Sequence, residues 1–137
     1  MDRFRGFVLT GAAIWCLLIL AAPIFQLQSV YLFFSTICHQ NPLRSWALAG
    51  EPLPVCIRCA CIYFGLFIGI LLAARTNFRL LKIASALTLT EFVLARVLVD
   101  SALLRGITGV LLGYAAAPFM ELGVKQMLQM RLRRGAV

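Results

Sequence analysis

Four long apolar segments, joined by short polar connections, constrain the fold of this chain more than any other feature. They cover residues 6–25, 56–74, 80–99 and 106–124, and each is close to the roughly 20 residues that a helix needs to cross a bilayer. Of all residues, 62% are hydrophobic and only 13% are charged, whereas soluble domains carry roughly 25% charged residues. We therefore predict an all-α integral membrane four-helix bundle. It forms a single domain over residues 1–137, with the lipid bilayer as its immediate partner.

The basic residues are divided unequally between the two ends of the predicted helices. Nine belong to the end that carries both termini: Arg3, Arg5, Arg75, Arg79, Lys82, Lys125, Arg131, Arg133 and Arg134. Three belong to the opposite end: Arg44, Arg58 and Arg105. The positive-inside rule then predicts a multi-pass protein of the cytoplasmic membrane with both termini in the cytoplasm and the loop 26–55 outside. Despite a net charge of +8, we expect no nucleic-acid partner, because the basic residues flank apolar segments instead of forming one patch.

The first apolar segment, residues 6–25, begins after two arginines, as the apolar core of a signal peptide also does. Its apolar run of about 19 residues exceeds the roughly 7–15 residues of a signal-peptide core. We expect this segment to be retained as a membrane anchor.

The reactive side chains gather around the loop 26–55, between the first and second segments. Four of the five cysteines and the only histidine lie within residues 38–61. The aromatic first half of the loop favours the membrane–water interface, and the prolines of its second half predict irregular backbone. These observations predict an interfacial loop that carries a site at the outer, oxidising face of the membrane.

Motifs in this region resemble those of a known family of small prokaryotic polytopic membrane proteins, DUF2085, a domain of unknown function. The first motif comprises Cys38-His39-Gln40, Arg44-Ser45, Pro54-Val55-Cys56, Arg58-Cys59, Ile62-Tyr63 and Gly65. Asp100-Ser101, Leu104-Arg105 and Thr108-Gly109 are similar to later pairs of that family. Cys61 departs from the pattern, in which this position is usually glycine. The resemblance implies a polytopic membrane fold and leaves the chemistry open.

A metal site is the function that these residues favour. The Cys-x-x-Cys pair of Cys56 and Cys59 places two sulfurs on one side of the backbone, as zinc and iron sites require. Cys38 supplies a third thiolate. Adjacent side chains tend to point apart, so His39 and Cys38 will not easily bind the same ion. We therefore expect zinc or iron on three thiolates, with His39, water or a substrate completing the site.

Three alternatives use the same residues. In a quinone-linked thiol-disulfide oxidoreductase, Cys38, Cys56 and Cys59 are the redox thiols and quinone is the cofactor. In a structural protein, Cys38 forms a disulfide with Cys56 or Cys59. In a non-catalytic accessory subunit, the chain binds another membrane protein or a second copy of itself. We favour a metal-binding protein without enzymatic activity; if it is an enzyme, we expect an oxidoreductase acting on thiols.

Charged residues inside the apolar segments predict a polar cluster beside the thiols, because a charge within a bilayer needs a partner. We expect Asp100 to pair with Arg96, four residues away, and to lie between Arg58 and Arg105. The supporting cluster comprises Gln40, Arg44, Arg58, Glu91, Arg96, Asp100 and Arg105. Its arginines at positions 44, 58 and 105 supply positive potential for an anionic partner or a lipid headgroup.

Small residues recur every four positions in two of the segments, which predicts close helix packing. One stripe comprises Gly65, Gly69 and Ala73, and the other comprises Gly109, Gly113 and Ala117. Cys61 is in register with the first stripe. We expect it to pack between the helices and not to belong to the site.

Overall fold

The structure, a computed structural model, describes residues 3–97 and 101–134; the side chains of Arg96 and of residues 132–134 are not described. Five α-helices occupy these ranges: α1 (Arg3–Ile24), α2 (Gln28–Ser35), α3 (Ile57–Leu71), α4 (Phe78–Val97) and α5 (Ala102–Arg134). The loop between α2 and α3 contains a 3₁₀ turn, η1 (Pro42–Arg44), and an antiparallel hairpin of β1 (Ala47–Leu48) and β2 (Glu51–Pro52). The prediction of a helical chain is confirmed.

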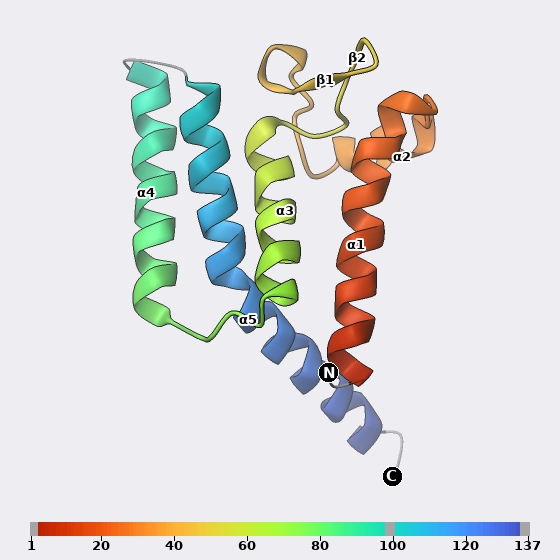
Figure 1. The fold of residues 1–137 in the computed structure, drawn as a ribbon, viewed down its shortest axis with the longest axis vertical. Coiled ribbons are helices and arrows are strands. Elements are labelled where there is room, and N and C mark those ends of the chain that lie inside the picture. The colour runs from red at the N-terminus through yellow and green to blue at the C-terminus, as the bar shows by residue number, and fades with distance from the viewer. Residues whose placement is uncertain (1–2, 98–100, 135–137) are drawn as a thin grey trace.

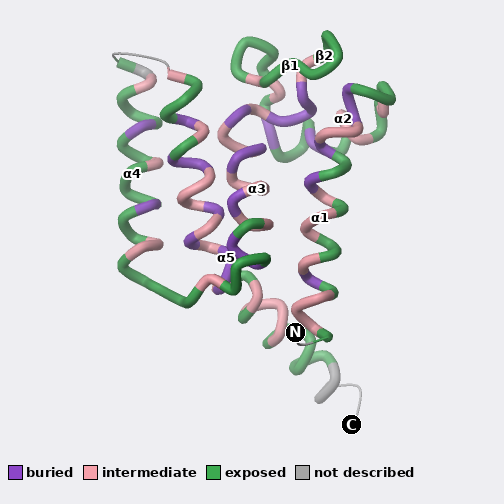
Figure 2. The backbone as a smooth tube through the Cα atoms, in the orientation of Figure 1, coloured by how far each residue is buried: buried purple, intermediate pink, exposed green. Residues whose placement is uncertain are grey.

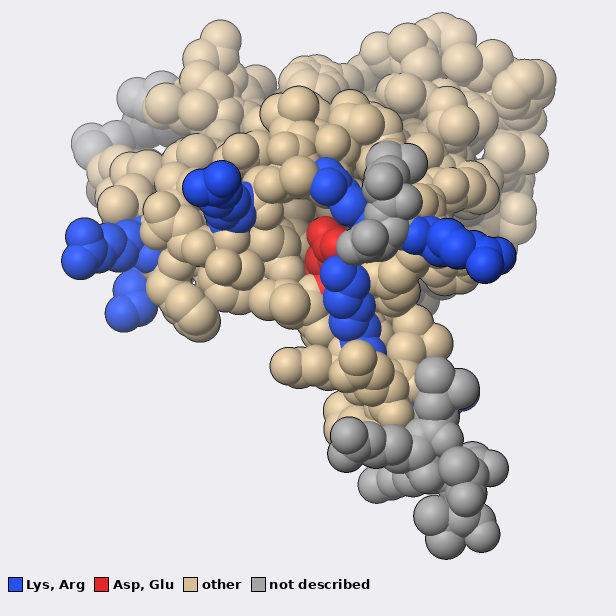
Figure 3. Space-filling model, turned by 60° about the horizontal axis from the view of Figure 1, so that its bottom comes forward, with Lys and Arg blue, Asp and Glu red and all other residues tan. Residues whose placement is uncertain are grey.

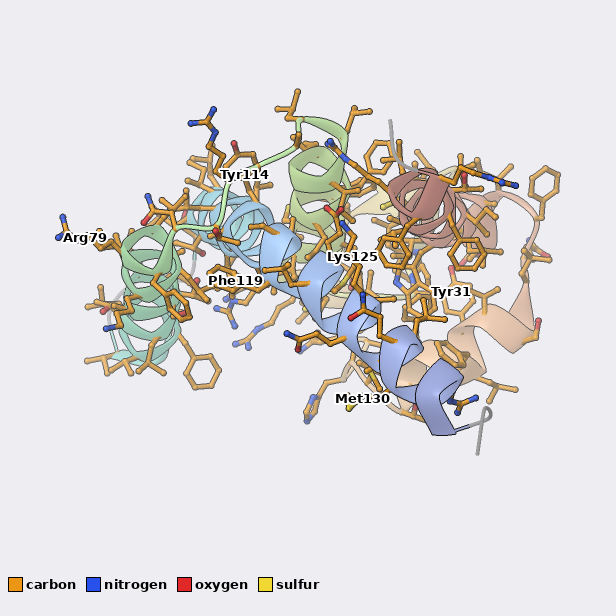
Figure 4. The ribbon with its side chains drawn as sticks, turned by 90° about the horizontal axis from the view of Figure 1, so that it is seen from below. Tyr31, Arg79, Tyr114, Phe119, Lys125 and Met130 are labelled. Atoms are coloured by element: carbon orange, nitrogen blue, oxygen red, sulfur yellow. The ribbon has the colours of Figure 1, made fainter. Side chains whose placement is uncertain are left out.

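The helices stand side by side in the order α4, α5, α3 and α1, forming a row (Figure 1). The hairpin and α2 lie at one end of this row, here called the loop end. The connection between α3 and α4 and both chain termini lie at the other end, the terminal end (Figure 1). The second half of α5 tilts toward α1, where Ala117 packs with Val8 and Ile70 (Figure 4). Helix α5 thus contacts all three of the other long helices.

Helices α1 and α5 (residues 102–131) are long and apolar enough to cross a membrane, and α3 is equally apolar but has 15 residues. Large apolar side chains are exposed on the outer sides of the row, including Phe7, Leu17 and Leu89. The buried backbone concentrates where α3 faces α5 and under the loop (Figure 2). Monomeric soluble proteins rarely expose apolar surface of this extent, so a lipid environment suits these faces.

The two stripes of small residues bring α3 and α5 into backbone contact, as predicted. A Cβ atom on Gly65 would overlap the carbonyl oxygen of Val110, and one on Gly113 would overlap that of Ile62. A Cβ on Gly109 would lie 3.0 Å from the Cβ of Cys61, which places Cys61 in this helix interface. Only glycine therefore permits this helix separation.

Helix α3 ends three residues before the predicted segment 56–74 does. Ala73, expected in the first stripe, follows the helix with φ 54° and is exposed. Arg5 donates from Nε to the Ile70 carbonyl at 3.0 Å and from Nη2 to the Leu71 carbonyl at 3.2 Å. The left-handed residue reverses the chain, and the guanidinium adds hydrogen bonds to the carbonyls of the last helical turn, where Ile70 also accepts from the Ala73 N–H at 3.3 Å.

Basic side chains are spread over the terminal end (Figure 3). This end carries the start of α1, the α3–α4 connection and the last turns of α5, where the sequence places most arginines and lysines. Lys125 pairs with Glu121 at 3.2 Å and lies 5.2 Å from the Phe4 ring centre. The division of charge between the two ends is therefore present in the fold, while the orientation in a membrane stays a prediction.

Candidate metal centre

Three thiols meet at the loop end of α3. The sulfur atoms of Cys38, Cys56 and Cys59 all lie within 4.8 Å of one another, and we call these residues the thiol cluster. Cys38 belongs to the loop that follows α2, Cys56 caps the N-terminus of α3, and Cys59 lies in the first turn of that helix. The Cys-x-x-Cys spacing explains why Cys56 and Cys59 lie together, because one helical turn brings both sulfurs to the same side.

The loop holds Cys38 against α3 through a short network of hydrogen bonds. The backbone N–H of Cys38 donates to the carbonyl of Phe34 at 2.8 Å, and the Phe34 side chain is fully buried. The side-chain amide of Gln40 donates to the carbonyl of Tyr31 at 2.6 Å and to that of Pro54 at 2.9 Å. Gln40 thereby links the segment before Cys38 to the segment before Cys56. This positioning role was not evident from its place in the sequence.

The start of α3 favours an ionised thiol. The backbone N–H of Cys56 donates to the sulfur of Cys38 at 3.3 Å, and the free N–H groups of the first helical turn add positive potential. A thiolate is the form that binds metals and attacks electrophiles.

The surroundings of the thiol cluster are mostly apolar. Cys38 is buried, Cys56 and Cys59 are half-buried, and all three pack with a core that includes Ile19 and Val55. The ring centre of Trp15 lies 5.3 Å from that of Phe34 and 5.8 Å from that of Tyr63. These three rings cover the side of the thiol cluster that faces α1. Such a shell limits access of water to the sulfurs.

His39 and the two remaining cysteines are not part of the thiol cluster. His39 is exposed, and the group of potential ligands found among the described residues contains only the three thiols. Cys61 packs against α5, as predicted, and Cys16 lies in α1 with its sulfur 3.6 Å from the carbonyl oxygen of Tyr63. All five cysteines are free thiols in the structure.

A second polar group lies on the α4 side of α3. Arg58 donates from Nη2 to Oε2 of Glu91, and Nε of Arg105 lies 3.7 Å from Oε1 of the same carboxylate. The side chains of Glu91 and Arg105 are 8% and 7% exposed, so this bridge is buried. The guanidinium of Arg58 also lies 5.4 Å from the centre of the Phe92 ring. Glu91 thus lies between Arg58 and Arg105, and all three belong to the polar cluster predicted from the sequence.

Asp100 lies outside the described residues, as does the side chain of Arg96, so the expected pair between them stays a prediction. The sequence predicted part of the environment of Glu91. It shares a helix face with Ala84 and Thr88, and the Thr88 hydroxyl lies 3.4 Å from the Thr108 carbonyl of α5. That face therefore packs against α5, which carries Arg105.

Comparison with known proteins agrees with this picture. The DUF2085 family, described as a predicted membrane protein, matches residues 38–119, which is more than half of the chain. The chain belongs to the DUF2085 family. The matched range begins at Cys38 and includes the whole thiol cluster and Glu91, so the resemblance seen in the sequence is confirmed. No solved structure matches the chain.

Two similar proteins come from archaea. An uncharacterised protein of Methanocaldococcus jannaschii is 32% identical over 84 residues, which cover 53% of this chain and 54% of the relative. An uncharacterised protein of Methanothermobacter thermautotrophicus is 47% identical over 34 residues, covering 25% of this chain and 31% of the relative. The chain therefore spans about half the length of the first and less than a third of the second.

Proposed function

We propose that this protein binds one transition-metal ion, zinc or iron, through the thiolates of Cys38, Cys56 and Cys59 at the outer face of a cell membrane. The observation that carries the proposal is the approach of three sulfur atoms from two segments to within 4.8 Å of one another. Sulfurs that share one tetrahedral zinc ion at roughly 2.3 Å lie about 3.8 Å apart. Small side-chain rotations suffice to reach that geometry.

Three protein ligands leave a fourth coordination position. Structural zinc sites fill all four positions with protein, whereas catalytic sites keep one for water or substrate. His39, adjacent to Cys38 and exposed, fills the position only if its side chain turns inward. A small external ligand is the simpler occupant, which suits a protein that receives or passes on its ion.

The membrane arrangement belongs to the same proposal. Helices α1, α3, α4 and α5 cross the bilayer, both termini lie in the cytoplasm, and the loop end faces outward. Helix α3, with 15 residues, is about 22 Å long, shorter than the roughly 30 Å hydrocarbon core. Either the bilayer thins at α3, or the thiol cluster lies slightly below the membrane surface, under the loop.

Thiol redox chemistry is the runner-up, favoured by the Cys-x-x-Cys pair of Cys56 and Cys59 at the start of α3. In that reaction two thiols form a disulfide, and two electrons and two protons pass to a quinone. A non-catalytic accessory subunit with the same metal site is a third form of the proposal. Metal content and thiol state separate the first two.

The test is metal analysis of the chain purified in detergent under reducing conditions, combined with a thiol count. We expect about one zinc or iron per chain, and loss of most of it in Cys56→Ser and Cys59→Ser. Cys61→Ala is the matched control, because Cys61 lies between the helices and should leave the metal content unchanged. A metal-free protein with a reversibly formed disulfide would favour the redox function, and a disulfide that resists reduction would exclude both.

A further inference from the structure

A polar pocket lies at the loop end, where the last turn of α1 meets α2 and the hairpin. It has a volume of about 170 Å³ and is lined by Pro23, Gln26, Gln28, Tyr31 and Glu51. A water molecule occupies about 30 Å³ in the liquid. The pocket therefore has room for a group of several non-hydrogen atoms, and we call it the loop-end pocket.

The loop-end pocket is electronegative. Glu51 of β2 supplies a carboxylate, and among the residues that the structure describes its side chain forms no ion pair and accepts no hydrogen bond. The pocket also contains the end of α1, where carbonyl groups lack intrahelical donors and carry partial negative charge. The last turn of α1 contains no basic residue that would offset this charge. A cation is therefore the complementary ligand.

Gln26 provides a second acceptor at a position where its backbone is strained. It follows α1 with φ 50°, the left-handed conformation that usually falls to glycine at the end of a helix. The N–H of Leu27 donates across this turn to the Ala22 carbonyl at 3.0 Å. Glutamine at this position brings an amide oxygen to the pocket, which glycine would not supply.

We propose that the loop-end pocket binds a primary ammonium group. Such a group donates three hydrogen bonds, and the pocket offers the Glu51 carboxylate, the Gln26 amide oxygen and the carbonyls at the end of α1. The Tyr31 hydroxyl donates to the Pro52 carbonyl at 2.6 Å, which fixes an aromatic ring beside these acceptors, and aromatic rings attract ammonium ions. Calcium fits less well, because it takes roughly six to eight oxygen ligands and the pocket has one carboxylate. The proposal does not depend on metal binding by the thiol cluster.

The ammonium group can belong to a lipid headgroup or to a soluble amine, and the same acceptors recognise both. The surroundings of the pocket favour the lipid. Ile24 and Phe25, which follow Pro23, are 53% and 70% exposed, and Leu32, next to Tyr31, is 70% exposed. Exposed apolar side chains of this kind suit a bilayer, where phosphatidylethanolamine presents a primary ammonium group at the surface.

The experiment uses the full chain in detergent and has two arms. In the first, native mass spectrometry measures retention of phosphatidylethanolamine against its N,N-dimethyl form with the same acyl chains, because the methyl groups remove two N–H donors. In the second, calorimetry follows titration with ethanolamine hydrochloride at constant ionic strength. Glu51→Gln should weaken binding about tenfold, because it removes the charge of the acceptor. Glu121→Gln, whose carboxylate pairs with Lys125 at the terminal end, is the matched control and should have no effect.

Gln26→Gly separates binding from folding. Glycine fits the left-handed backbone, so thermal unfolding should show a variant at least as stable as the wild type, while binding weakens about fivefold. Retention of phosphatidylethanolamine without binding of ethanolamine identifies a lipid headgroup, and binding of ethanolamine without a lipid preference identifies a soluble amine. The proposal is wrong if the wild type shows neither, if Glu51→Gln binds as the wild type does, or if Gln26→Gly keeps full affinity.

Discussion

The thiol cluster and the ion-paired group of Arg58, Glu91 and Arg105 use the same turn of α3 but lie in different surroundings. The sulfurs of Cys56 and Cys59 face the loop and α1, within an apolar core. Arg58, between them in sequence, points toward α4, where it meets Glu91. Opposite sides of one helical turn therefore carry the thiols and the guanidinium group. The soft sulfur ligands lie close to this cation without a direct pair of thiolate and guanidinium.

Glu91, in the second of these regions, should contribute more to stability than a carboxylate in a surface ion pair does. Glu91→Gln leaves the buried Arg105 and the half-buried Arg58 without their shared carboxylate, so we expect the free energy of unfolding to fall by about 3–5 kcal/mol. Thermal unfolding in detergent measures this. Glu121→Gln is the control, because that carboxylate forms an i,i+4 pair with the partly exposed Lys125 and should cost less than about 0.5 kcal/mol. Equal effects of the two variants would remove the distinction between a buried and a surface pair.

The packing of α3 on α5 supports both regions at once. Gly113→Ala places a Cβ against the Ile62 carbonyl and forces the helices apart, so we expect a loss of about 1–3 kcal/mol in unfolding free energy. Gly11→Ala in α1 is the control, since a Cβ there meets nothing within 4 Å. Chemical unfolding of the two variants measures the difference, and a neutral Gly113→Ala would mean that the helices are not in backbone contact.

A third change should act on the thiol region alone. Gln40→Leu removes two hydrogen bonds that hold the loop beside α3, so metal affinity should fall about tenfold while the pair of Arg58 and Glu91 stays intact. Competition with a chelator measures the affinity. Gln28→Leu, an exposed glutamine at the start of α2, serves as the control. If Gln40→Leu binds the metal as tightly as the wild type does, these hydrogen bonds do not position Cys38.

Sequence patterns with a fixed local geometry predicted the structure best. The apolar segments predicted the four long helices, the four-residue spacing of glycines predicted the contact of α3 with α5, and the Cys-x-x-Cys pair predicted two adjacent sulfurs. Each of these follows from the helical repeat alone. The approach of Cys38 was predicted by assigning it as the third thiolate of a metal site.

Features that depend on several segments at once were harder to predict. Glu91 joins residues of α3 and α5, and no spacing within α4 specifies those partners. The end of α3 depends on the left-handed conformation of Ala73, which alanine adopts only when the tertiary structure stabilises it. Gln40 acts through the backbone carbonyls of Tyr31 and Pro54, which carry no signal in the side-chain sequence.

The close contact of α3 with α5 has a consequence for biogenesis. Translation proceeds from the N-terminus, so α3 is made well before its principal partner and waits with its glycine face uncovered until the last helix emerges. Helix α4 is made in between, and it allows the pair of Arg58 and Glu91 to form while synthesis continues. A nascent chain stalled before α5 should therefore hold its charges in partial balance but lack its tightest helix contact, which makes it a natural substrate for membrane quality control.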